Sequence, residues 1–331
     1  MSTIGALKES IGPEQPPAHT GFAGEAVALA YIALIATIAS LTGAFYVMFP
    51  ELGALSHDVF TRPRGTWARS PMMLAVTPVL TGAVGVAVTN WLPYGYASVM
   101  LIVGASILII ELLKSPVAPA ISAGLLPRVI NVTSWWYAPG IMLGTFALAG
   151  LSILWKKIAA PAADNPPRDH PVDDALEETG SGYLWLAPLL TFVLVATFIV
   201  KLTGLRFILF PPLVVIGFEM FGHTAICPWA QRPLWLPVAC FLTAFGGLVV
   251  YRLFGFNFLT AGCSMAWGIL VLRWFNLHVP PALAVALLPM VMDHPTVWYP
   301  ISVGIGTLTC TVWFLLYQSH IEPYWTRETA G

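Results

Sequence analysis

The chain has very few charged residues. Asp, Glu, Lys and Arg make up 9% of its 331 residues, whereas hydrophobic residues make up 57%. Soluble domains have about 25% charged residues, so this composition excludes an ordinary soluble protein and indicates a membrane protein. The net charge is −1 and there is no polybasic cluster, so nothing in the charge pattern favours nucleic acid as a partner. We expect the lipid bilayer, a small-molecule solute and, in one alternative, a second copy of the chain as partners.

Cysteine pairs, metal-binding spacings and nucleotide-binding loops are also scarce or missing. The four cysteines, Cys227, Cys240, Cys263 and Cys310, show no CxxC spacing, and we interpret them as small core residues. There is no HxxxH or HxxH pair and no Walker-type glycine loop. We therefore expect no metal, no cofactor and no ATP-driven chemistry in this chain.

Long apolar stretches are what the chain has in abundance. A membrane-spanning helix needs about 20 apolar residues, and the stretches that qualify are 24–48, 71–90, 94–113, 134–155, 183–204, 234–253, 257–275 and 296–317. Residues 158–182 are rich in Pro, Asp and Glu, which is typical of a solvated linker. The pattern predicts an all-α polytopic membrane protein. We expect a polar tail at 1–23 that is not a signal peptide, membrane halves at 24–157 and 183–319, and a C-terminal tail at 320–331.

The two halves resemble each other in sequence. A shift of 162 positions places Trp67 on Trp229, Gly85 on Gly247 and Tyr137 on Tyr299. Matches that concentrate on Gly, Pro and Trp predict an internal duplication. Four spans in each half return the chain to its starting side, so the halves should share one orientation and both termini should lie on one side. The distribution of Lys and Arg does not decide which side that is; we expect the cytoplasmic side of a bacterial inner membrane.

Each half also has two apolar stretches that are too short to span a membrane. They are 49–60 and 115–127 in the first half, and 210–221 and 278–289 in the second. Prolines interrupt them at Pro50, Pro116, Pro119, Pro211, Pro212, Pro280 and Pro281. Such lengths predict broken or re-entrant half-helices, with a proline kink in a long span or a surface loop as the alternatives. A half-helix that begins inside the membrane aims free N–H groups and its positive dipole end at its surroundings, which suits an anion.

Polar residues beside the broken segments are the candidate site residues, because ionisable groups in a membrane are costly and usually functional. Asp58 and Glu219 are candidates for binding a coupling proton or ion, although acids at helix ends are the alternative reading. The candidates for binding solute are Arg62, Arg64, Lys114, Ser115, His223, Thr224, Gln231, Arg232, Asn276 and His278. Guanidinium groups suit a small oxyanion, but loop arginines at the surface and a helix-capping His278 fit the sequence equally well.

Three further patterns give expectations about packing. Glu111 and Lys114 are spaced to neutralise each other, which leaves Arg273 to find a carboxylate elsewhere or a bound anion. Aromatic residues at the starts of spans, namely Trp135, Trp136, Tyr137, Trp298 and Tyr299, are typical of belts at the membrane surface. Glycines at 82–88, 245–248 and 304–307 predict close helix contacts.

A family resemblance adds to this reading. CPWAQRP at 227–233, followed by His278 and Pro280-Pro281 with ALAVALLP, resembles the HPP family of integral membrane proteins, which is named for a His-Pro-Pro motif. Val279 stands between the histidine and the prolines here. The resemblance implies a four-span unit thought to transport solutes, with nitrite as the solute associated with a plant member.

Together these features predict a secondary transporter or channel for a small anionic solute, such as a nitrite-like oxyanion, bound between the broken helices of the two halves. One alternative is an intramembrane enzyme that acts on a lipid or quinone, with Glu219 and His223 as acid and base. Another alternative is a structural subunit.

Overall fold

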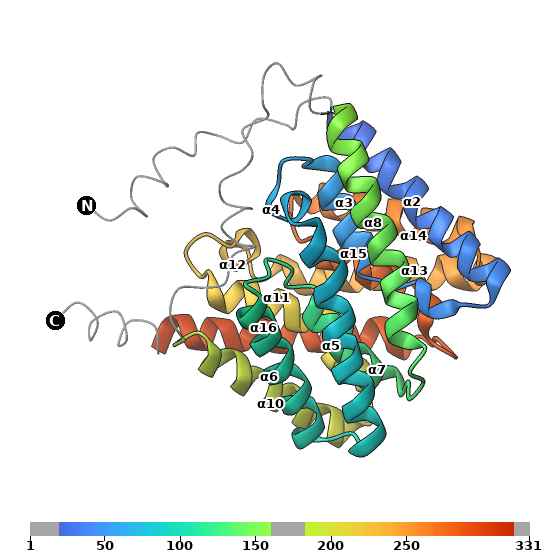
Figure 1. The fold of residues 1–331 in the computed structure, drawn as a ribbon. Helices are drawn as coiled ribbons and strands as arrows, with labels where there is room; N and C mark the ends of the chain where they lie inside the picture. The colour runs from blue at the N-terminus through green and yellow to red at the C-terminus, as the bar shows by residue number, and fades with distance from the viewer. Residues whose placement is uncertain (1–19, 160–182, 321–331) are drawn as a thin grey trace.

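Figure 1 shows the computed structural model of the protein, which describes residues 20–159 and 183–320. The described residues form helices and contain no strand. Eight helices among them are long and apolar enough to cross a membrane: α2 (Thr20–Thr42), α5 (Pro71–Trp91), α6 (Tyr96–Leu113), α8 (Tyr137–Ala159), α10 (Leu186–Thr203), α13 (Trp235–Phe254), α14 (Phe258–Phe275) and α16 (Trp298–His320). The predicted all-α membrane fold is therefore confirmed. Most of the predicted N-terminal tail, the linker and the C-terminal tail lie outside the described residues.

Shorter helices occupy the segments that prolines interrupt. They are α3 (Leu52–Thr61), α7 (Ala120–Ile130), α11 (Pro211–Gly222) and α15 (Pro281–Leu287), and we call these four the half-helices. The remaining short elements are η1 (Phe45–Val47), α4 (Thr66–Arg69), η2 (Arg206–Leu209), α12 (Pro228–Gln231) and η3 (Leu288–Val291). Apart from η3, which extends α15, the elements occur in the same order in both described halves.

Proline sets where each half-helix begins. Pro119 and Pro280 are the cap residues before α7 and α15, and Pro211 is the first residue of α11. Proline is favoured at a helix start because its ring presets the helical φ and its missing N–H has no intrahelical partner there. Pro50, Pro116, Pro212 and Pro281 lie within one turn of these starts.

The segment that ends in α3 is a broken pass along the bundle and not a re-entrant loop. Near the start of α8, an added Cβ at Gly140 would lie 2.6 Å from Tyr46 Cβ. Near the end of α8, the indole of Trp155 donates to the carbonyl of Phe60 at 2.9 Å. Residues 45–61 therefore run along almost the whole of α8.

The segment that ends in α7 is a second broken pass. It runs beside α5, where Thr77 donates to Ser115 at 2.8 Å near one end and Arg128 donates to the carbonyl of Leu92 near the other. The first half thus has six passes along the bundle: the four long helices that the sequence predicted and two broken ones. An even number still returns the chain to its starting end.

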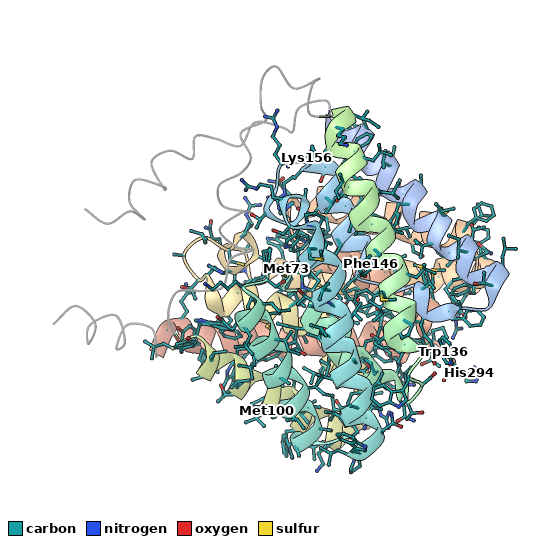
Figure 2. The ribbon with its side chains drawn as sticks, viewed as in Figure 1. Met73, Met100, Trp136, Phe146, Lys156 and His294 are labelled. Atoms are coloured by element: carbon teal, nitrogen blue, oxygen red, sulfur yellow. The ribbon has the colours of Figure 1, made fainter. Side chains whose placement is uncertain are left out.

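The two halves run in the same direction within the bundle. Glu25 near the start of α2 pairs with Arg273 near the end of α14, and Lys201 near the end of α10 lies over the ring of Tyr96 at the start of α6. We call the end of the bundle with Glu25 the first end and the end with Tyr96 the second end. Figure 2 shows Lys156 at the first end of α8 and Trp136 at its second end. That the first end faces the cytoplasm stays a prediction.

Glycines allow helix backbones to touch at matching places in both halves. An added Cβ at Gly85 would lie 2.0 Å from the carbonyl oxygen of Gly124, and one at Gly247 would lie 2.1 Å from that of Ala286. The first contact joins α5 to α7, and the second joins α13 to α15. The predicted close contacts at these glycines are confirmed.

Two tyrosines that the sequence assigned to surface belts point inward. Tyr137 and Tyr299 are each 2% exposed, and their hydroxyls donate to the carbonyls of Ala123 and Val285 at 2.9 and 2.5 Å. The belt prediction is therefore wrong for them, because each hydroxyl finds a partner inside the bundle on a half-helix. The neighbouring tryptophans are exposed, as expected of a belt, at Trp135, Trp136 and Trp298.

The cysteine prediction holds for three of four residues. Cys227, Cys240 and Cys310 are buried, and all four cysteines are free thiols. Cys263 is exposed on α14, so it is not the core residue that its apolar surroundings in the sequence indicated.

The backbone contact at Gly85 gives a test of this packing. We expect Gly85→Ala to lower the free energy of unfolding by about 1–3 kcal/mol, because the new methyl group would overlap the carbonyl of Gly124. Thermal unfolding of the purified protein in detergent measures the change. Gly104→Ala on α6 is the matched control, since an added Cβ there meets nothing within 4 Å. Equal stability of the two variants would contradict the contact.

Candidate functional site

Half-helices from the two halves meet inside the bundle. α3 packs on α15 and α7 packs on α11, so each of these contacts joins one half to the other, and α11 also packs on α15. Gly53 near the start of α3 is the point of approach to α15, since an added Cβ there would lie 2.6 Å from Leu287 Cδ1. Figure 1 shows α3 and α15 side by side behind α8. The first residues of the four half-helices, Leu52, Ala120, Pro211 and Pro281, are all buried.

The first amides of the half-helices are already used. In α3, Leu52 and Gly53 donate to the carbonyls of Phe49 and Pro50 at 2.9 and 3.0 Å. Ala120 and Ile121 of α7, Leu213 of α11, and Ala282 and Leu283 of α15 donate in the same way to the turn that precedes them. The expectation that free N–H groups would form an anion site is therefore wrong for these amides, because tight turns pair them. Of the two features expected to attract an anion, only the positive end of each helix dipole is still available.

The ionisable group at this junction is Glu51, which is not among the residues predicted from the sequence. It is the cap residue of α3, it is 1% exposed, and neither carboxyl oxygen has a hydrogen-bond partner. Ser122 of α7 interacts with this carboxyl, yet its own hydroxyl forms no hydrogen bond of regular geometry. The rings of Tyr137 and Tyr299 lie within electrostatic range of Glu51. We call Glu51, Ser122, Tyr137 and Tyr299 the Glu51 site.

Asp58 and Arg62, which were predicted to bind an ion and a solute, pair with each other. Asp58 is 1% exposed, and its Oδ1 accepts from both Nε and Nη2 of Arg62 at 2.7 Å. The two residues are four apart on α3 and its C-cap, which is the spacing at which helix side chains meet. The buried carboxylate of Asp58 therefore has a cation beside it, which offsets the cost of burying its charge.

Arg273 finds its carboxylate across the halves. Both carboxyl oxygens of Glu25 accept from its Nη2 at 2.7 Å, and Nε2 of His57 lies 3.7 Å from Glu25 Oε1. Arg273 therefore does not need a bound anion. We call the Glu25–Arg273 pair the latch, because it joins α2 to α14. The predicted Glu111–Lys114 pair does not form: Lys114 is exposed and ends α6 in the left-handed conformation, which turns it away from the helix.

The other predicted residues lie at the first end, outside the Glu51 site. Glu219 is buried at the end of α11, with His223 one turn later and Thr224 after it. Ser115 is buried and accepts a hydrogen bond from Thr77, and Arg64 is partly exposed in the loop after α3. The exposed ones are Lys114, Gln231, Arg232, Asn276 and His278. The sequence thus indicated one end of the bundle and not its centre.

The second end joins the halves by different chemistry. The guanidinium groups of Arg128 and Arg206, one from each half, lie 5.9 and 5.3 Å from the ring centre of Tyr94. Burial raises the pKa of the Tyr94 hydroxyl to about 12, against the opposing effect of the two cations. Tyr94 therefore stays neutral and serves as an aromatic face for both arginines.

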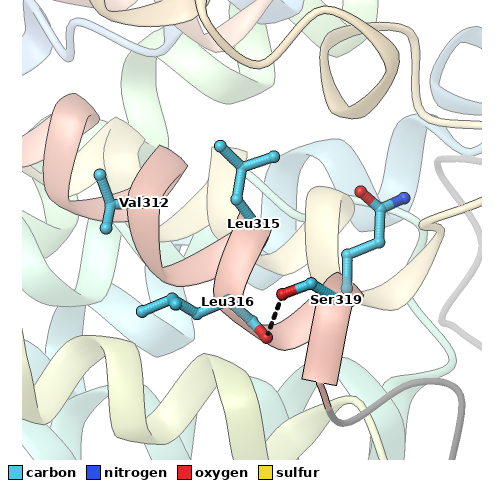
Figure 3. A pocket seen from close by; sticks show the side chains of 5 residues that line it. Val312, Leu315, Leu316 and Ser319 are labelled. Carbon is cyan, nitrogen blue, oxygen red and sulfur yellow. Dashed lines mark hydrogen bonds between the residues drawn. The ribbon is translucent and has the colours of Figure 1, made fainter.

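The Glu51 site is not a metal centre, and its four residues are all buried. Within residues 20–159 and 183–320, no group of three or more His, Cys, Asp or Glu residues is placed to hold a metal ion. The open depression in Figure 3 lies on the outer face of α16, is lined by Val312, Leu315, Leu316, Gln318 and Ser319, and contains no ionisable side chain.

The chain matches no family model, no curated protein and no solved structure.

The Asp58–Arg62 pair predicts a particular pattern of stability. We expect Asp58→Asn to lower the free energy of unfolding by about 3 kcal/mol, because it removes the carboxylate that pairs with the mostly buried guanidinium of Arg62. The double variant Asp58→Asn with Arg62→Gln should regain at least half of that loss. Denaturation in detergent measures both. A single variant as stable as the wild type would show that the pair is not structural.

Proposed function

We propose that this protein is a secondary transporter or channel for a small solute that binds at the Glu51 site. The observation that carries the proposal is the meeting of half-helices from both halves around one buried polar group. Irregular backbone at membrane depth persists only where protein buries it or where it lines a cavity, and transporters use such breaks to build their sites.

An internal duplication is part of this proposal. The shared order of elements supports it, as do the glycine contacts and tyrosine hydrogen bonds that recur 162 positions apart. Both halves run in the same direction, so an axis along the membrane normal would relate them. In proteins built this way, alternating access results when one repeat rocks against the other around a fixed site.

A small oxyanion is the solute class that we propose. A protonated Glu51 and the hydroxyl of Ser122 are hydrogen-bond donors, and the half-helix starts place positive dipole ends around them. The exposed residues Lys114, Arg232 and His278 at the first end would attract an anion toward that entrance. The resemblance of the second half to the HPP family makes nitrite the first solute to test.

The rocking motion predicts that a covalent crosslink at the latch will slow transport. Rocking of one half against the other requires the start of α2 to separate from the end of α14, where Glu25 and Arg273 meet. We expect a short, reducible thiol crosslinker between cysteines at these two positions, in a Cys263→Ser background, to lower nitrite uptake into proteoliposomes at least tenfold. Reduction of the crosslink should restore the uptake.

Controls separate the crosslink from the substitutions. The single variants Glu25→Cys and Arg273→Cys, treated with the same reagent, report what loss of the latch does by itself. Nitrate, sulfite and formate are tested in parallel with nitrite. Uptake of none of the four by the wild type would overturn the oxyanion proposal, and an unchanged rate in the crosslinked protein would overturn the rocking motion.

A further inference from the structure

We infer that Glu51 binds and releases the proton that drives transport, and that it is the single such site among the residues that the structure describes. The inference rests on the proposed function and goes further than it, because it assigns the coupling ion and the residue that carries it. The group differs from Asp58 and Glu219, on which the sequence pattern had placed that role.

The first support is the lack of any countercharge at Glu51. Glu25 has Arg273 and Asp58 has Arg62, each at 2.7 Å. Glu51 is as deeply buried as Asp58 but has neither a cation nor a hydrogen-bond donor of regular geometry. An isolated carboxylate is far more costly to bury in an apolar interior than the neutral acid is. With a proton bound, Glu51 is compatible with the closed bundle that the structure shows.

The second support is the hydrogen-bonding capacity of its neighbours. Tyr137 and Tyr299 donate their hydroxyl hydrogens to backbone carbonyls, so their oxygens are left as acceptors. Ser122 is a rotatable hydroxyl with no fixed partner. A carboxylic acid can donate to any of these oxygens, but a carboxylate would have only the Ser122 hydroxyl to receive a hydrogen bond from. Loss of the proton therefore requires water or a solute to enter.

The other titratable groups near the site carry no charge that could compensate Glu51. Tyr46 packs edge-on against Tyr137, and Cys240 lies within range of Tyr299. On the elements packed against α3, Tyr31 donates to the carbonyl of Gly144. The acidic and basic side chains of α3 and these elements lie toward the first end, namely Glu25, His57, Asp58, Arg69, Lys156 and Lys157. The site thus has no fixed cation among the described residues that face it.

The third support is that both halves build the site. Glu51 and Ser122 belong to α3 and α7 of the first half, and Tyr137 begins α8 of the same half, whereas Tyr299 begins α16 of the second half. Movement of one half against the other therefore changes the surroundings of Glu51, and a change of surroundings changes which protonation state is favoured. Proton binding and conformation are then linked.

The second half has no counterpart of Glu51 or Ser122, so the site occurs once in the two described halves. Pro212 stands where the first half has Glu51, and Ala284 stands where it has Ser122. In each cycle one O–H bond forms as a proton passes from water to a Glu51 carboxyl oxygen, and the same bond breaks as the proton leaves to water at the other end. No oxidation or reduction is involved.

Glu51→Gln tests the assignment, because the amide has the shape of the protonated acid but cannot exchange a proton. Proteoliposomes that contain the full chain are given nitrite with or without an inward proton gradient. We expect the wild type to accumulate nitrite only with the gradient, and Glu51→Gln to lose at least nine-tenths of this accumulation while still exchanging nitrite downhill. Glu111→Gln, at the end of α6, is the control and should behave as the wild type.

Infrared spectroscopy of the detergent-purified protein provides a readout that needs no solute. A carbonyl band of a protonated carboxyl group should be present at neutral pH in the wild type and in Glu111→Gln, and missing in Glu51→Gln. Glu51→Asp, which should shift the band, replaces the glutamine variant if that variant is not monodisperse. Absence of a band difference would overturn proton binding at Glu51.

The outcomes of the flux assay are distinct from failure of the proposed function. Proton-driven accumulation that survives in Glu51→Gln overturns the coupling role. Accumulation that follows a sodium gradient and not a proton gradient, and is lost in Glu51→Gln, replaces the proton by sodium. No nitrite flux in the wild type removes the oxyanion proposal and the coupling built on it, while the infrared band still decides whether Glu51 holds a proton.

Discussion

The polar groups of an interrupted backbone must be satisfied inside an apolar bundle, and the rest of this structure depends on how that is done. Proline at the half-helix starts removes donors that would have no partner, and tight turns pair the first amides that remain. The continuous helices before the second broken pass of each half end at Lys114 and Asn276, both in the left-handed conformation, which turns the chain sharply inward. The first backbone amides at each break therefore have hydrogen-bond acceptors within the same segment. This allows the half-helices to lie deep in the protein.

Three of the acids differ in how their charge is compensated. Buried Asp58 and partly exposed Glu25 each pair with an arginine, one within its own helix and one across the halves. Glu51 is not satisfied by any described residue. The two ends of the bundle also differ: the halves meet through an ion pair at the first end and through arginines on the Tyr94 ring at the second. Because the ionic contact can be exchanged for water at lower cost when it is partly exposed, the ends are not equivalent.

Much of the fold could be predicted from the sequence, because apolar length and proline position act locally. The eight long helices and the places of the breaks follow from these two signals. The direction in which a side chain points does not follow from these signals. A tyrosine at the start of a span has the same sequence context whether it faces lipid or, like Tyr137, the carbonyl of a half-helix residue. Whether a break is re-entrant or a complete pass depends on contacts between distant segments, such as Trp155 with Phe60.

The candidate site was harder to predict, and the reasons are specific. Pairing of the two halves drew attention to acids that recur, Asp58 and Glu219, and away from Glu51, whose counterpart is Pro212. The signal for Glu51 was nevertheless present, since it is an isolated acid directly after a proline within an apolar stretch. The spacing of Asp58 and Arg62, four residues apart at the end of one helix, could have indicated a local pair, but we did not predict one.

The glycine contacts described above divide the molecule into parts that slide and parts that do not. The carbonyl of Gly124 lies in the space beside Gly85, and the carbonyl of Ala286 lies in the space beside Gly247. The two backbones are in close contact at each place, so sliding of one helix along the other would produce steric overlap. The interfaces between α2 and α14 and between α6 and α10, which we call the seams, are formed by side chains. Side chains can change rotamer and make new contacts after a displacement. The helices of one half are thus expected to travel as a single block, with displacement concentrated along those two seams.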